Sequence, residues 1–278
     1  MLKRIFFILP LLTGCFAGNL FSAPEINHPL LEQAKQERSS RYQFALQHGV
    51  ETGLTPEGKS FYLLWLPQGR STQEMPPLIV TISGHSGWAF DDFFVWEPFA
   101  KARGYGVLSV QWWLGEGERI NDYLKPVEIY RAIGAVLEKE KIRPGTVLFH
   151  GFSRGATNTY AIAAMDRSTK NNYFALVIAN AGRPNSNYPP IRDVEQGRFG
   201  PRPLEGSQWI TFGGAKDPNP ERDGIQGMRE AGDWIRKYGG VVDLAIEDPE
   251  QGHGGFHRNP KNTEVALDVF EKLRLKNA

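Results

Sequence analysis

A strand, a tight turn and a helix are predicted one after another over residues 146–165, and they limit the folds open to this chain. Residues 147–149 (Val-Leu-Phe) are typical of a buried strand, and an alanine-rich segment follows the turn. The turn, residues 151–155, reads Gly-Phe-Ser-Arg-Gly. Glycines two residues before and two after Ser153 relieve crowding where a strand reverses sharply into a helix. We expect this turn to lift the Ser153 hydroxyl clear of a sheet, at the positive end of the helix. The alternative is a glycine turn with only a structural role.

This G-x-S-x-G pattern between a strand and a helix resembles the nucleophile elbow of the α/β-hydrolase fold. G-F-S-R-G-A is a form seen in its esterase and dienelactone-hydrolase-like branches. The resemblance extends from about Phe61 to the C-terminus. It implies an α/β fold with a mostly parallel central sheet and helices on both faces. It also implies a triad in the chain order Ser, Asp or Glu, His, with no cofactor.

The acid that the resemblance implies follows a predicted strand at residues 208–212. Asp217 occupies a Gly-x-x-Asp-Pro slot there, where it would accept the imidazole N–H and hold the correct tautomer. Asp223 is the competing carboxylate. We favour a different role for Asp223, as support for the start of a helix predicted near Ile225.

The base that the resemblance implies follows the last predicted strand, residues 241–246. Gly252-His253-Gly254 resembles the histidine loop of the family, in which glycines let the backbone bring the ring over the serine. His253 would take the serine proton and return it to the leaving group. His257 is the alternative base.

The turn after the predicted strand 78–82 reads Ser-Gly-His-Ser-Gly-Trp over residues 83–88. The resemblance implies that one backbone N–H of this turn binds the oxyanion, together with the N–H of Arg154, the residue after the nucleophile. A serine stands where the family usually has its first histidine. We therefore expect the donor to be the N–H of His85, or that of Ser86 if the register shifts by one. The alternative is a glycine-rich turn without a role.

Two further segments are predicted near the substrate. Trp88, Trp112 and Trp113 lie just beyond predicted strands, where ligand-binding loops emerge, and are candidate walls of a substrate pocket. The alternative is that they pack beneath a loop. Residues 185–206 are rich in Pro, Gly, Asn and Arg with little apolar periodicity. They are predicted to replace a helix between strands, and to form either a substrate lid or an ordinary surface loop.

The amino terminus has the pattern of an export signal. A basic start precedes a short apolar run, and Leu12-Thr13-Gly14-Cys15 resembles a bacterial lipobox. We expect residues 1–14 to be a lipoprotein-type signal peptide and Cys15, the only cysteine, to carry a lipid as the sole membrane attachment. The alternatives are a secretory signal cleaved near Ala17 or Ala23, or a retained anchor. The protein is accordingly predicted to be exported to the cell envelope, in the periplasm or outer membrane, or else to be secreted or soluble in the periplasm.

The rest of the chain, residues 15–278, suits one domain with an N-terminal arm to about residue 55. A formal net charge of +1 gives no electrostatic reason to expect a nucleic-acid partner. Six histidines without an H-x-H or H-E-x-x-H pattern favour no metal. The predicted function is a serine hydrolase that cleaves small or polymeric carboxylic esters. A peptidase or amidase of the same fold, and a non-catalytic envelope lipoprotein that uses the fold as a binding module, are the alternatives.

Overall fold

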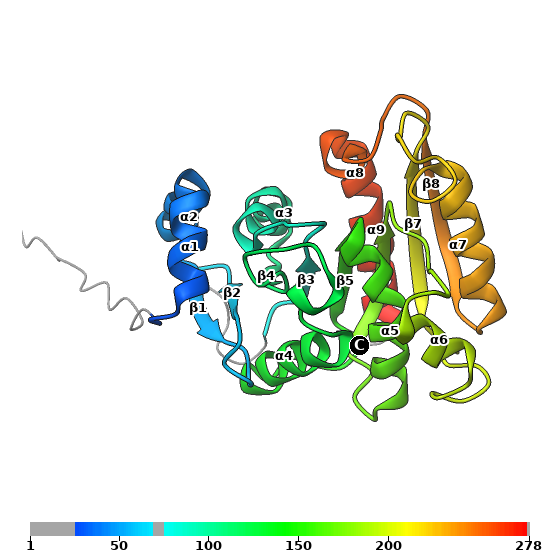
Figure 1. Cartoon of the computed structure of the whole chain (residues 1–278), viewed down its shortest axis with the longest axis horizontal. Coiled ribbons are helices and arrows are strands. Elements are labelled where there is room, and N and C mark those ends of the chain that lie inside the picture. Colours follow the sequence, from blue (N-terminus) through cyan, green and yellow to red (C-terminus); the bar gives the residue numbers. More distant parts are fainter. Residues whose placement is uncertain (1–25, 69–74, 277–278) are drawn as a thin grey trace, which may run out of the picture.

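A computed structural model describes residues 26–68 and 75–276 of the chain (Figure 1). One eight-stranded sheet runs through these residues. Its strands are β1 (Glu51–Leu54), β2 (Phe61–Trp65), β3 (Leu78–Ile82), β4 (Gly106–Val110), β5 (Val147–Phe152), β6 (Phe174–Asn180), β7 (Gln208–Gly214) and β8 (Val241–Asp248). The helices are α1 (Pro29–Glu37), α2 (Ser39–Gln47), α3 (Ala89–Arg103), the 3-10 turn η1 (Ile120–Asp122), α4 (Pro126–Lys139), α5 (Arg154–Ser168), α6 (Pro189–Glu195), α7 (Ile225–Lys237), α8 (Gly255–Arg258) and α9 (Pro260–Lys276).

The strand order across the sheet is β1-β2-β4-β3-β5-β6-β7-β8. Strands β1 and β2 pair antiparallel, as do β2 and β4, and every other neighbouring pair is parallel. Strands β3, β5, β7 and β8 coincide with the strands predicted at residues 78–82, 147–149, 208–212 and 241–246, whereas the short edge strand β1 was not predicted. Because the strands from β3 to β8 are parallel, their carboxyl ends and the loops that leave them gather at one edge of the sheet.

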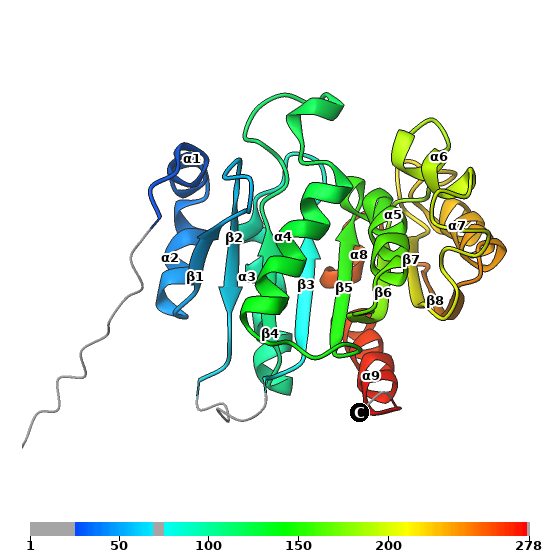
Figure 2. The ribbon, with the colours of Figure 1, turned by 90° about the horizontal axis from the view of Figure 1, so that it is seen from below.

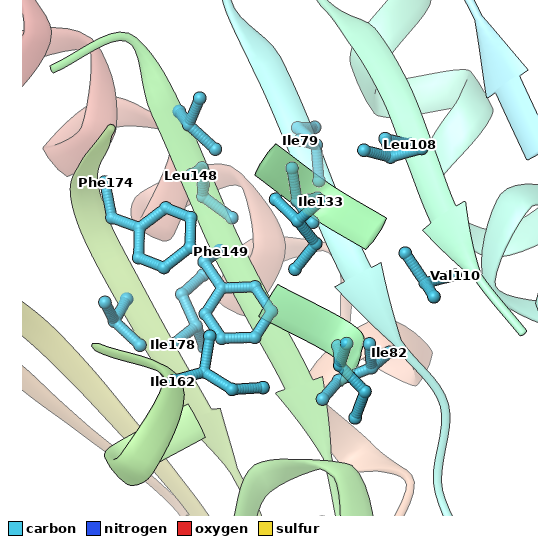
Figure 3. Packing of buried hydrophobic residues seen from close by; sticks show 14 of the residues in the cluster. Ile79, Ile82, Leu108, Val110, Ile133, Leu148, Phe149, Ile162, Phe174 and Ile178 are labelled. Atoms are coloured by element: carbon cyan, nitrogen blue, oxygen red, sulfur yellow. The ribbon is translucent and has the colours of Figure 1, made fainter. Parts of the chain in front are cut away.

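Helices cover both faces of the sheet, as the sequence predicted. α4 and α5 lie against one face, and α3 and α9 lie against the other (Figure 2). Every residue of β3, β4 and β6 is buried and most are apolar, as expected where both faces of a sheet are covered. On the face covered by α4 and α5, Phe149 of β5 stacks on Phe174 of β6, with ring centroids 4.8 Å apart, in the part of the core that holds Ile133 of α4 and Ile162 of α5 (Figure 3).

The N-terminal arm forms two helices, α1 and α2, which lie at the β1 edge of the sheet (Figure 1). Polar contacts tie the arm to the start of α3: Arg38 donates to Asp91 (2.9 Å), and the Trp88 indole donates to Glu37 (3.1 Å). Gln33 donates to the backbone oxygen of Gly115 (2.8 Å). The arm therefore supports the segment that directly follows the predicted oxyanion turn.

The structure corrects the prediction that no helix lies within residues 185–206. This segment contains the short helix α6, and Ile191, Val194 and Leu204 are fully buried. Tyr188 donates to Asn158 of α5 (2.7 Å), and Trp234 of α7 donates to Glu195 (2.9 Å). A segment with these anchors matches the surface-loop alternative better than a free lid.

The predicted signal peptide and Cys15 lie outside the described residues. In the part of the chain that the structure describes, no helix is both long and apolar enough to cross a membrane.

Candidate active site

Ser153 sits at the turn between β5 and α5 with a strained backbone. Its φ of 53° and ψ of −115° lie in a region that residues other than glycine rarely adopt, at a typical cost of about 1–3 kcal/mol. Such strain persists only where the surroundings impose it, and it is concentrated at functional sites. The Ser153 N–H donates to the backbone oxygen of Asn180 at the end of β6 (2.7 Å), which holds the turn against the sheet.

The glycines around the serine allow backbones to approach closely. A Cβ on Gly155 would lie 2.4 Å from the backbone oxygen of Ser83, and one on Gly151 would lie 2.6 Å from that of Gly155. A Cβ on Gly182, which follows β6, would lie 2.2 Å from the backbone oxygen of Ser153. The sharp reversal therefore needs glycine at each of these positions, which is the physical reason for the G-x-S-x-G pattern.

The structure brings Ser153, His253 and Asp217 together in one hydrogen-bonded chain. His253 Nδ1 lies 2.7 Å from Asp217 Oδ2, and His253 Nε2 lies 2.7 Å from Ser153 Oγ. A carboxylate can only accept, so the ring proton lies on Nδ1 and donates to Asp217. Nε2 then accepts from the serine hydroxyl. The three residues are 64 and 36 positions apart in the chain, and three different loops at the carboxyl edge of the sheet bring them together.

Asp217 is held in place on both oxygens. Its side chain is fully buried, and Oδ1 accepts the backbone N–H of Asn219 (2.8 Å) while Oδ2 accepts from the histidine. The imidazole of His253 packs against the ring of Phe152, with centroids 5.1 Å apart. These contacts fix the orientation of the imidazole, as a general base requires.

The turn over residues 83–87 lies directly beside the nucleophile. A Cβ on Gly84 would lie 3.3 Å from Ser153 Cβ. The N–H of Ser86 donates to the hydroxyl of Tyr123 (3.3 Å), so of the two expected oxyanion donors the Ser86 amide already has an acceptor. The amide of Arg154 is the first of α5, and the first amides of a helix lack acceptors within it.

A hairpin that was not predicted lies beside this turn. It spans residues 113–123, includes η1, is closed by a bridge between Trp113 and Tyr123, and projects beyond the carboxyl ends of the strands (Figure 2). Arg154 donates to the backbone oxygen of Glu118 (2.9 Å), and its guanidinium lies over the Tyr123 ring, 4.2 Å from the centroid. The Glu118 carboxylate lies 3.4 Å from His85 Nε2. The hairpin thus contacts both residues predicted to supply oxyanion donors.

A cavity of about 660 Å³ opens next to His253. Phe152 and His253 form the wall nearest the serine, Val95 and Asp92 of α3 form another, and Arg258 of α8 lies on a third. A site of this volume is large enough for a small organic ligand.

The three tryptophans predicted to bind substrate do not line this cavity, and neither does Ser153 itself. Trp88 and Trp112 are at most 2% exposed, and Trp113 is 8% exposed. Their indole N–H groups all have protein acceptors: Glu37 for Trp88, the Ser83 oxygen for Trp112 and the Gly117 oxygen for Trp113. The alternative stated for them, packing beneath a loop, describes their positions. Phe152, which the sequence analysis did not single out, is the aromatic residue on the cavity wall.

Asp223 and His257 are the alternatives that the sequence left for the triad acid and base, and the structure places only Asp223 close to His253. Asp223 does not cap α7, which begins after Gly224 without a side-chain cap, and its carboxylate instead lies beside Asp217 and His253. His257 contacts neither Ser153 nor Asp217. It packs among Trp96, His150 and Phe256 and lines the cavity.

Burial favours the neutral form of the two histidines His150 and His257, which line the cavity. Burial lowers the pKa of His257 from 6.5 to about 3, and it lowers the pKa of His150 well below its usual value, with a further contribution from His257. His150 lies 3.1 Å from the Asn180 amide and 2.9 Å from Thr81 Oγ1. Burial also raises the pKa of Asp92 well above its usual range, which favours its neutral form.

These histidines should make the fold sensitive to acid. Above pH 6.5 the folded and unfolded states both hold a neutral His257, but below it only the unfolded state takes up the proton. Stability is therefore lost as the pH falls from about 6.5 towards 3. We expect His257→Gln to remove about 2 kcal/mol of the difference in unfolding free energy between pH 7.5 and pH 5, measured by urea unfolding at each pH. Equal losses in His257→Gln and the wild type would contradict a buried, neutral His257.

Comparisons with solved structures agree with this architecture. A hyperthermophilic esterase from the archaeon Pyrobaculum calidifontis superposes with a TM-score of 0.58 at 16% identity, over 91% of this chain and 99% of that one. A thermostable esterase superposes with a TM-score of 0.56 at 19% identity over 80% of this chain, which spans 62% of the length of that esterase. This chain has the α/β-hydrolase fold.

The α/β-hydrolase fold of this chain is also similar to that of a peptidase. An acylaminoacyl peptidase from Pyrococcus horikoshii superposes with a TM-score of 0.53 at 13% identity, over 77% of this chain and 40% of that one. No protein-family model matches the sequence, and no curated protein matches it. At these identities the likeness establishes the fold, and the chemistry has to be argued from the site itself.

Proposed function

We propose that this protein is a serine hydrolase that cleaves carboxylic esters through an acyl-enzyme. The observation that carries the proposal is the hydrogen-bonded chain from Ser153 Oγ through the His253 ring to Asp217, with both distances at 2.7 Å. A serine whose hydroxyl donates to an oriented imidazole is the arrangement that activates this nucleophile.

Ser153 Oγ attacks the ester carbonyl carbon while its proton moves to His253 Nε2. The imidazolium that forms is stabilised by Asp217, which accepts from Nδ1 and keeps its own negative charge. The carbonyl oxygen becomes an oxyanion, and the backbone N–H groups of His85 and Arg154 are the proposed donors to it. The strained turn places the hydroxyl at the start of α5, whose positive end favours the same charge.

Collapse of this intermediate breaks the bond between the carbonyl carbon and the alcohol oxygen. His253 gives its proton to the leaving alcohol, so the acyl group stays on Ser153 as an ester. Water then attacks the acyl-enzyme, losing a proton to His253 Nε2, and the second collapse returns that proton to Ser153 Oγ. The products are an alcohol and a carboxylic acid, and the site is restored.

The same residues could also cleave amides, and the similarity to an acylaminoacyl peptidase keeps a peptidase or amidase as the second candidate. A binding module without activity would have no need of a strained serine that contacts an oriented imidazole. The proposed location of the protein in the cell envelope rests on the signal pattern of residues 1–15.

Two measurements on the protein lacking residues 1–14 test the proposal. A fluorophosphonate probe should label the protein, and Ser153→Ala should abolish the labelling. A panel of nitrophenyl esters of increasing chain length, aromatic esters and acetylated xylan should reveal ester hydrolysis, and matched anilides should be cleaved more slowly because an amine is a poorer leaving group. Unchanged labelling of Ser153→Ala would exclude this nucleophile, and faster cleavage of anilides would favour the amidase.

A further inference from the structure

We propose that Asp223 is a second acid of the active site. This inference depends on the proposed function. The carboxylate of Asp223 stabilises the charged form of His253 and substitutes for Asp217 when that side chain is removed, so Asp223 acts as a positioning residue. The observation behind it is proximity: one oxygen of Asp217, one oxygen of Asp223 and one ring nitrogen of His253 all lie within 4.8 Å of one another. Asp223 is 4% exposed, so little solvent screens its charge from the imidazole.

The loop after β7 folds back on itself and brings both carboxylates to the histidine. The backbone oxygen of Asn219 accepts the N–H groups of Arg222 (3.0 Å), Asp223 (2.8 Å) and Gly224 (3.2 Å). The Asn219 N–H in turn donates to Asp217 Oδ1 (2.8 Å). A Cβ on Gly224 would lie 3.2 Å from Asp217 Cβ, so this glycine lets the end of the loop close against its start.

Two carboxylates this close repel each other, and Arg222 offsets the repulsion. Its Nε and Nη2 both donate to Asp223 Oδ2, at 2.8 and 2.6 Å. The Arg222 side chain is 64% exposed whereas that of Asp223 is 5% exposed. The guanidinium is therefore the better screened of the two charges, and a net negative field from Asp223 reaches the buried side of the site.

During the reaction a positive charge forms on His253, within reach of the field from Asp223. When Ser153 loses its proton to Nε2, the His253 ring becomes positively charged, and a nearby carboxylate lowers the free energy of that state. If Asp217 is shortened to alanine, the Nδ1–H loses its acceptor. The Asp223 carboxylate is then the nearest acid, close enough to accept that N–H after a small shift or through one water molecule.

Other titratable groups line the cavity together with His253. They belong to α3 (Asp91 and Asp92), to the loop after β7 (Lys216) and to α8 (His257 and Arg258), and burial favours the neutral forms of Asp92 and His257. All five are retained in every variant described below, so differences between variants report on Asp223 and Arg222.

The pH dependence of kcat/KM for a nitrophenyl ester tests the electrostatic part. Its acid limb reports the pKa of the free base. Asp223→Asn removes a negative charge, so we expect the limb to move to lower pH by about half a unit or more. Arg222→Gln removes the compensating positive charge and should move the limb the opposite way. Asp233→Asn and Arg236→Gln, which alter an exposed pair on α7, are the matched controls and should leave it in place.

The second part of the proposal, that Asp223 takes over from Asp217 when that side chain is removed, is tested by combining variants at the two positions. Asp217→Ala should keep at least about tenfold more activity than His253→Ala, as triads generally do, and Asp223 should supply part of the activity that remains. The double variant Asp217→Ala with Asp223→Asn should lose the activity that remains in Asp217→Ala. Asp223→Asn alone should lower kcat by less than about tenfold. Opposite shifts of the acid limb and loss of the residual activity support a second acid.

An unmoved acid limb in both Asp223→Asn and Arg222→Gln, or a double variant as active as Asp217→Ala, would refute the role of Asp223. These failures are distinct from failure of the proposed function. That failure appears in the starting protein, as ester hydrolysis that is absent or that survives in Ser153→Ala.

Discussion

Replacing His253 by alanine should lower kcat for ester hydrolysis by roughly five to six orders of magnitude while the protein stays folded. The imidazole is the group in contact with both Ser153 Oγ and the buried Asp217, so its removal leaves the serine without a base and the alcohol without a proton donor. In a triad that works as a unit, losing the serine or the histidine costs about as much as losing all three residues. The value of kcat should be measured from the steady-state rate, after any initial burst, at saturating concentrations of a nitrophenyl ester.

The combined variant shows whether the residues work together. Ser153→Ala with His253→Ala should be no slower than either single variant, since each already removes the whole covalent route. The buried His257 provides the matched control: His257→Gln removes an imidazole near the site that does not touch the serine, and it should change kcat by less than about tenfold at pH 8. If His253→Ala loses less than tenfold, or if the losses in the double variant multiply, another base serves the serine.

The features that the sequence predicted well depend on local patterns. The buried strands are short apolar runs, and the elbow is a contiguous pentapeptide whose glycines have a steric reason that any similar turn would share. Asp217 and His253 each follow a strand of the same parallel sheet, and parallel strands deliver their carboxyl ends to one edge. The resemblance to a known fold then selected which of the loop residues to compare.

The features that were missed depend on tertiary packing. An indole that follows a strand can face a pocket or the core, and Trp112 faces the core because the Ser83 oxygen accepts its N–H there. The short helix α6 begins at Pro189, and the prolines that signalled a loop are also suited to the first turn of a helix. Asp223 was predicted to support a helix because it stands just before a helix start in the sequence. Its actual position follows from the loop that is closed by hydrogen bonds to the Asn219 oxygen.

Replacing Gly155 by alanine should destabilise the fold by about 3 kcal/mol and lower esterase activity in the protein that remains folded. The added Cβ would lie 2.4 Å from the backbone oxygen of Ser83 and 2.6 Å from that of Ile82. Both oxygens belong to backbone at the end of β3, which is paired on both sides in the middle of the sheet and cannot give way as a flexible side chain would. The clash is therefore relieved by moving the start of α5, and with it Ser153, away from the turn that precedes α3.

Gly134 supplies a matched control for the Gly155 substitution, because it lies inside α4 and a Cβ there meets nothing within 4 Å. Gly134→Ala should raise the free energy of unfolding by up to about 1 kcal/mol, since alanine favours a helix and limits the unfolded chain. Urea unfolding of the two variants should thus give changes of opposite sign for the same chemical substitution. If Gly155→Ala is as stable as the wild type and labels normally with a fluorophosphonate, the close contact between α5 and the end of β3 does not hold the nucleophile in place. The strain at Ser153 would then have to be maintained by its N–H bond to Asn180 and by the approach of Gly182.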